Sequence, residues 1–159
     1  MGNLLLNRVK FFLIILTASL SFIAQAWAES PKSIVGATTV DLVEARDLHE
    51  QGAVFIDVRD QGAFRLGHIP GAVHLDFNDD AFVVLYVSDA LDRDTPIVFY
   101  CDSALASAGA MASFFAANWG YKNVYFFRDG YYSWMASDFP IQYQVAQSSG
   151  GFQMVSAPQ

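Results

Sequence analysis

The sequence predicts an α/β domain with a central parallel sheet and helices on both faces. Three observations support this fold class. The continuous run at 97–100 has the β-branched and aromatic composition of a strand that is buried on both sides, and further strands are expected at 53–58 and 123–127. Stretches with helical periodicity or helix-forming composition separate these runs, and glycines end several of them. Strands that alternate with helices at this spacing indicate a parallel sheet.

The first 28 of the 159 residues have the pattern of an export signal. Arg8 and Lys10 form a basic start, an apolar run extends over 11–23, and Ala26-Trp27-Ala28 matches a small-x-small cleavage site. We therefore predict a signal peptide at 1–28. A single-pass membrane anchor is the alternative interpretation of this segment.

Removal of the leader would leave one domain at 29–146 and a small, polar tail at 147–159 that is predicted to be disordered. The net charge would change from −7 to −9, because two basic residues leave with the leader. A protein with this net negative charge repels nucleic acids and anionic membranes. We therefore expect no nucleic-acid partner and no stable membrane association after cleavage. The expected location is the periplasm, if the source is a Gram-negative bacterium, or the extracellular space. The sequence does not determine the oligomeric state.

Local signals place the individual elements. Thr39 is expected to cap the first helix, over 40–51, and Gly52 to end it. Residues 82–87 have the composition of a strand as well as of a helix, and the sequence leaves both open, although we favour the helix. The other elements are expected in this order: a short polar helix at 61–66, a turn and a short strand within 67–75, a helix at 82–91 capped by Asn78 or Asp79, a helix at 107–118, and a last short helix around 129–134.

The only cysteine, Cys101, lies between the apolar strand at 97–100 and the alanine-rich helix at 107–118. Side chains that follow the strands of a parallel sheet gather at its carboxyl edge, where α/β proteins place their sites. The free N–H groups and the dipole of the following helix favour a thiolate at this turn, or an anion bound to its sulfur. The alternative is that Cys101 is a small buried hydrophobic residue. The chain has no C-x-x-C pair, which excludes dithiol chemistry within it.

Four segments, in this order, resemble the rhodanese family of single-domain sulfurtransferases. They are 55–59 (FIDVR), 67–72 (GHIPGA), the Tyr100-Cys101 loop, and 120–124 (GYKNV) followed by Asp129-Gly130 and Trp134. The resemblance implies a rhodanese fold and a cysteine that carries sulfane sulfur as a persulfide. In the implied mechanism the Cys101 thiolate attacks thiosulfate or a persulfide, and the sulfur then passes to a thiophilic acceptor. The implied partner is a small sulfur donor or a persulfide-bearing protein, and no cofactor is expected.

The loop after the cysteine would hold an anion with its backbone amides. Family members commonly place Arg or Lys in this loop, whereas this chain places no cation there. Leu105 cannot bind a sulfonate oxygen, and Asp102 places a negative charge beside the thiol. Because the helix terminus and this carboxylate nearly cancel, we expect a Cys101 pKa not far below that of an ordinary thiol, and weak affinity for the thiosulfate dianion. The loop residues are Asp102, Ser103, Ala104, Leu105, Ala106 and Ser107.

Three other residues are candidates for supporting roles. Asp57 and Arg59 end a strand and are placed to reach the cysteine loop, or alternatively Arg59 forms a structural ion pair with Asp60 or another acid. Ser107 either caps the following helix or donates a hydrogen bond to the sulfur.

Other chemistry is excluded by spacing or composition. A cysteine phosphatase needs an arginine six residues after its cysteine, and Ser107 occupies that position. The three histidines have no clustered carboxylate and predict no metal site; His68 is expected to be structural and His49 to be solvated. The sequence favours a sulfurtransferase. A rhodanese-fold binding module with little or no turnover, and a redox protein with a reactive lone thiol, are the alternatives.

Overall fold

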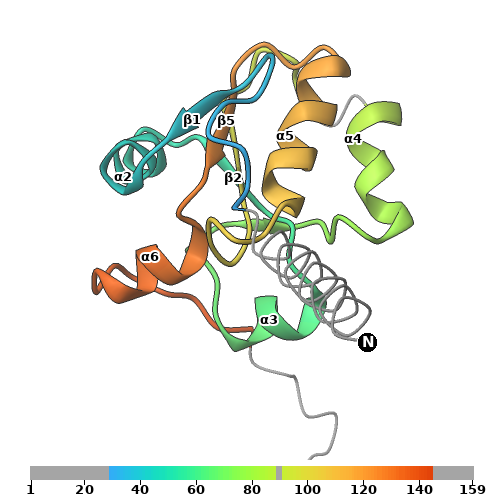
Figure 1. Cartoon of the computed structure of the whole chain (residues 1–159). Helices are drawn as coiled ribbons and strands as arrows, with labels where there is room; N and C mark the ends of the chain where they lie inside the picture. The colour runs from blue at the N-terminus through green and yellow to red at the C-terminus, as the bar shows by residue number, and fades with distance from the viewer. Residues whose placement is uncertain (1–28, 89–90, 145–159) are drawn as a thin grey trace, which may run out of the picture.

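A sheet of five parallel strands forms the centre of the domain (Figure 1). The structure is a computed structural model, and it describes residues 29–88 and 91–144. The strand order is β1-β5-β4-β2-β3, so β4 lies in the middle and pairs with β2 and β5. The prediction of an α/β domain with a parallel sheet is confirmed. The strands are β1 (Thr38–Val40), β2 (Val54–Asp57), β3 (Val73–His74), β4 (Ile97–Tyr100) and β5 (Val124–Phe127).

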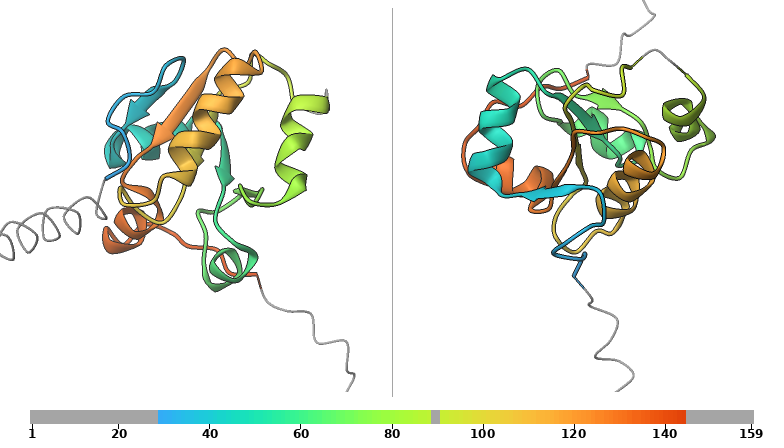
Figure 2. Two further views of the ribbon diagram at one scale, coloured as in Figure 1. Left: turned by 45° about the vertical axis from the view of Figure 1, so that its right-hand side comes forward. Right: turned by 90° about the horizontal axis from the view of Figure 1, so that it is seen from above.

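Helices cover both faces of this sheet, as Figure 2 shows from two further directions. On one face α4 and α5 pack over Ile56 and Phe99, and on the other face α2 and α6 pack over Phe55 and Tyr100. Neighbouring residues of β2, β4 and β5 therefore enter opposite cores, which explains why these strands are largely apolar on both faces. The helices are α2 (Leu42–Glu50), α3 (Gln61–Leu66), the 3₁₀ helix η2 (Asp80–Val83), α4 (Val84–Val87), α5 (Ala108–Asn118) and α6 (Gly130–Ala136).

The start of the first helix differs from the prediction. Thr39 does not cap a helix, because it lies in β1 and is paired with Phe126 of β5. The cap is Asp41, whose carboxylate accepts a hydrogen bond from the Glu44 N–H at 3.0 Å, while the Glu44 carboxylate accepts one from the Asp41 N–H at 2.9 Å. This reciprocal capping box satisfies two N–H groups, whereas a cap at Thr39 would remove an edge strand from the sheet.

The segment after Asn78 is helical, and the alternative of a strand is wrong. Asp79 caps it by accepting a hydrogen bond from the Ala81 N–H at 3.0 Å. Phe82 and Leu85 enter the core, whereas the residues between and after them are exposed, which is the spacing of a helix. The helix ends at Val87, earlier than predicted.

Two histidines have structural roles. His68 is buried and stacks on Phe64 with 3.8 Å between ring centroids, which confirms the prediction for this residue. His49 was expected to be solvated, and this is wrong. Its ring contacts Phe55 and Trp134, and its Nε2 lies 2.8 Å from the Pro70 carbonyl oxygen. The opposite face of α2 is the one that meets solvent.

The signal peptide predicted at 1–28 and the polar tail predicted at 147–159 both lie outside the described residues. Both therefore stay predictions. Within the described ranges, no helix has the length and hydropathy needed to cross a membrane.

Candidate functional site

Cys101 follows the central strand directly, at the carboxyl edge of the sheet. Its side chain is only 8% exposed. The carbonyl oxygen of Cys101 accepts a hydrogen bond from the Tyr131 N–H at 2.9 Å, and that of Asp102 accepts one from the Tyr132 N–H at 3.0 Å. The start of α6 therefore holds the backbone at the cysteine in place.

Gly130 allows this close approach. Its φ is +67°, in the left-handed region, and a Cβ added there would lie 2.5 Å from the Cys101 carbonyl oxygen and 2.9 Å from that of Asp102. A side chain at this position would push α6 away from the cysteine loop. This close approach explains why a glycine follows Asp129 in the segment that resembles the rhodanese family.

Two of the amides expected to hold an anion are used inside the loop. The Ala106 N–H donates to the Ser103 carbonyl oxygen at 3.0 Å, and the Leu105 N–H donates to the Ser103 hydroxyl at 3.3 Å. The expectation that all amides of the loop face an anion is therefore wrong for these two. Ser107 precedes α5, but its hydroxyl forms no capping hydrogen bond, so the capping role is wrong as well. Donation from Ser107 to a sulfur on Cys101 stays a prediction.

Asp57 and Arg59 form a buried ion pair beside the cysteine loop. Arg59 donates from Nη2 to Asp57 Oδ2 at 2.6 Å and from Nε to Asp57 Oδ1 at 2.9 Å. The expected structural ion pair is confirmed, but its acid is Asp57. Asp60 instead caps α3 by accepting hydrogen bonds from Gly62 and Ala63. Burial by itself lowers the pKa of Arg59, but the hydrogen bonds and the charge of Asp57 outweigh it and raise that pKa further.

The guanidinium of Arg59 also reaches the cysteine loop. Its Nη1 lies 3.5 Å from Asp102 Oδ1, and its carbon lies 4.1 Å from the ring centroid of Tyr131. The loop has no cation of its own, yet the end of β2 places one next to its carboxylate. Spacing in the sequence could not assign Arg59 to Asp102, because the two residues are 43 positions apart.

Burial raises the pKa of the Cys101 thiol to about 11. The Asp102 N–H lowers this pKa, while the carboxylates of Asp102 and Asp57 raise it and Arg59 lowers it. The expectation of a pKa slightly below that of an ordinary thiol is therefore wrong. The sequence suggested the charges around the sulfur, but it did not show how far the sulfur is removed from water.

Comparisons with known proteins fit this geometry. A family model described as "Rhodanese-like domain" matches residues 41–137. The chain belongs to this family. The prediction of a single-domain rhodanese relative is confirmed.

Several known rhodanese-like proteins resemble this chain. The thiosulfate sulfurtransferase GlpE of Pseudomonas savastanoi pv. phaseolicola is 36% identical over 94 residues, which are 59% of this chain and 83% of GlpE. GlpE of Pseudomonas fluorescens is 34% identical over 109 residues, covering 69% and 90% of the two chains. The human single-domain sulfurtransferase TSTD1 shares 28% identity and a TM-score of 0.52, over 63% of this chain and 96% of TSTD1. The rhodanese-like domain of Alr3790 from Anabaena, at 22% identity and a TM-score of 0.56, shares the fold, over 76% and 93%.

The rhodanese-like domain shows no arrangement suited to a metal ion in the residues that the structure describes. Within those residues, no three His, Cys, Asp or Glu side chains lie together as a set of ligands would.

Replacing Gly130 by Ala is expected to destabilise the domain more than replacing Gly120 by Ala. Both glycines are left-handed, with φ of +67° and +93°, but a Cβ at Gly120 would meet nothing within 4 Å. Gly120→Ala should cost about 1–2 kcal/mol for its backbone alone. Gly130→Ala should cost about 1–3 kcal/mol more, because the Cβ contacts the cysteine loop. Urea unfolding measures both, and equal losses would contradict the crowding at Gly130.

The rate at which iodoacetamide alkylates Cys101 should keep rising up to a pH of about 11, because only the thiolate reacts and its pKa is raised. The thiol of the unfolded chain should level off earlier. Asp102→Asn removes a negative charge beside the sulfur, so it should lower the pKa and accelerate alkylation at pH 8 several-fold. Asp138→Asn, which changes a carboxylate that does not act on the thiol, is the matched control. An unchanged rate in Asp102→Asn would show that this carboxylate does not influence the thiol.

Proposed function

We propose that this protein is a sulfurtransferase in which Cys101 carries sulfane sulfur as a persulfide. The observation that supports this most is the place of the only cysteine, which directly follows the central strand of a rhodanese-like domain. The GlpE relatives named above are thiosulfate sulfurtransferases, which supports the same class of reaction.

The reaction has two steps. The Cys101 thiolate attacks the outer sulfur of the donor, the sulfur–sulfur bond of the donor breaks, and sulfite leaves from thiosulfate or a thiolate leaves from a persulfide. The outer sulfur of the Cys101 persulfide is then attacked by a thiophilic acceptor, and the Cys101 thiolate is restored. Neither step requires an oxidant, a reductant or a cofactor.

The surroundings of Cys101 favour a donor with less charge than the thiosulfate dianion. Leu105 is 59% exposed on the loop and offers no donor to a sulfonate. Arg59 cannot easily replace a loop cation, because its Nε and Nη2 are held by Asp57 and by the Gly67 carbonyl oxygen at 2.7 Å, and its Nη1 faces Asp102. We infer that a persulfide, on a small thiol or on a partner protein, is the better donor.

We further propose that the protein is exported to the periplasm or secreted, with residues 1–28 removed. The basic, apolar and small-x-small pattern of this segment supports the proposal. An exported protein with a lone cysteine buries the thiol, pairs it with another chain or keeps it reactive for use, and Cys101 is buried, with 8% exposure.

Intact mass measured after exposure to a sulfur donor tests the function. Wild-type protein purified from cells should gain one sulfur atom, about 32 Da, from glutathione persulfide and less readily from thiosulfate. Cyanide should remove this sulfur as thiocyanate, and Cys101→Ser should gain nothing. The mass before treatment also shows whether residues 1–28 are absent.

One observation favours a second function. The cysteine loop contains no cation and Cys101 is only 8% exposed, and this burial raises the pKa of the thiol, as suits a rhodanese-fold binding module with little turnover. A folded protein with a free thiol that gains no sulfur from either donor would contradict the sulfurtransferase and support this module.

Leu105→Arg should lower the KM for thiosulfate by about tenfold, because a charge-assisted hydrogen bond to the sulfonate then becomes possible. The KM for glutathione persulfide should change less. Leu66→Arg is the matched control. Leu66 is 80% exposed on α3, so this substitution adds the same charge outside the loop. Equal changes in the two variants would mean that overall charge, and not the loop, limits thiosulfate binding.

A further inference from the structure

An apolar groove lies beside the cysteine loop, between the segment at 31–35 and α5. Its volume is about 370 Å³. No lining residue carries a charge, and the only polar side chains are the hydroxyls of Ser33 and Ser107. Apolar concavities of this size with a few polar groups are typical sites for small organic molecules. The groove is lined by Pro31, Ser33, Ile34, Val35, Ser107, Ala110, Met111, Phe114 and Phe115.

Both walls of this groove are attached to the cysteine loop. On the first wall, the Ser30 N–H donates to the Ala104 carbonyl oxygen at 2.6 Å, immediately before Pro31. Arg128 holds the same point, since its Nε and Nη2 both lie 3.2 Å from the Ser30 carbonyl oxygen. The groove therefore begins where the segment at 31–35 leaves the loop.

On the second wall, Ser107 belongs to the loop and to the groove. Two residues further, Gly109 lies so close to the cysteine that a Cβ added to it would be 3.4 Å from the Cys101 backbone nitrogen. The next residue, Ala110, lines the groove. The groove therefore runs along α5 from the end of the cysteine loop, and Ser107 is the residue of that loop that lines it.

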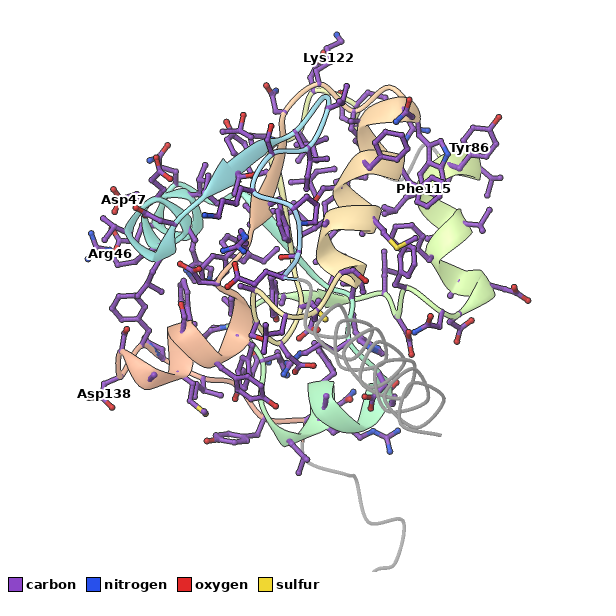
Figure 3. All side chains as sticks on the ribbon, viewed as in Figure 1. Arg46, Asp47, Tyr86, Phe115, Lys122 and Asp138 are labelled. Carbon is purple, nitrogen blue, oxygen red and sulfur yellow. The ribbon has the colours of Figure 1, made fainter. Side chains whose placement is uncertain are left out.

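The far part of the groove exposes large apolar side chains to solvent. Met111 is 45% exposed and Phe114 is 44% exposed. Phe115 stacks on Trp119, which also contacts Tyr86 of α4, so aromatic side chains adjoin this end of the groove. Figure 3 labels Phe115 and Tyr86 on the two helices. Apolar side chains exposed around a concave site mark a surface that an apolar ligand would cover.

We propose that this groove binds the hydrocarbon arm of an organic persulfide, R–S–SH, and that the outer sulfur of this donor is transferred to Cys101. The inference rests on the sulfurtransferase function proposed above, and it names the class of donor. The Cys101 thiolate attacks the outer sulfur, the S–S bond of the donor breaks, and R–S⁻ leaves and takes up a proton. The lining of the groove carries no charge, which suits an uncharged hydrocarbon arm. The cysteine loop has no cation that would favour a dianion over such a donor.

Labelling of Cys101 by methanethiosulfonates tests the groove without any turnover. The thiolate attacks the sulfenyl sulfur of R–S–SO₂CH₃, methanesulfinate leaves, and a mixed disulfide Cys101–S–S–R forms. The measured quantity is the rate ratio of the benzyl to the methyl reagent on the full-length protein, divided by the same ratio for free cysteine. We expect a corrected ratio of about five or more for the wild type, because the benzyl arm is removed from water in the groove.

Two methionine variants locate the effect. Met111→Gln should bring the corrected ratio close to one, because it places an amide in the apolar lining. Met135→Gln should keep the wild-type ratio, since Met135 is 42% exposed on α6 and does not line the groove. The same ratio in all three proteins would overturn the proposal.

A corrected ratio near one in the wild type would also overturn it, and would leave the groove to another occupant, such as a second copy of this chain. If the protein is labelled selectively by the benzyl reagent but gains no sulfur from glutathione persulfide, binding in the groove is supported and the sulfurtransferase function is contradicted. The two proposals therefore fail in distinguishable ways.

Discussion

The buried ion pair of Asp57 and Arg59 is the interaction on which the rest of the site depends. Two charges this far from water are tolerated only when they are paired and hydrogen-bonded, and removing one partner of such a pair costs about 3–5 kcal/mol. Arg59 contacts Asp57 of its own segment, the Gly67 carbonyl oxygen, Asp102 beside the cysteine, and the Tyr131 ring on α6. The four segments that resemble the rhodanese family in the sequence therefore meet at one guanidinium.

This arrangement determines what the cysteine loop can do. The donors of Arg59 are directed at protein groups, so the guanidinium stabilises the carboxyl edge of the sheet and screens Asp102. Burial, the largest influence on the thiol, raises the pKa of Cys101 to about 11. A site with a buried thiol, no loop cation and an adjoining apolar groove is better suited to an uncharged sulfur donor than to a dianion.

The sequence predicted the sheet and the place of Cys101, because buried parallel strands are continuous apolar runs that local pattern detects. It failed where two local signals compete or where distant segments meet. Thr39 is an acceptable cap, but pairing with Phe126 and the stronger box at Asp41 place it in a strand. The contact of Arg59 with Asp102 and the burial of the thiol depend on tertiary packing, which residue types at fixed spacings do not encode.

The ionic-strength dependence of sulfur loading from thiosulfate shows whether the site at Cys101 repels or attracts a dianion. A dianion that approaches an acidic protein, with a carboxylate beside the thiol and no cation in the loop, is repelled, and salt screens this repulsion. The second-order rate of persulfide formation on Cys101 should therefore rise as salt is added at constant pH. A rate that falls with added salt would show that the site attracts the dianion, and would contradict this account of the cysteine loop.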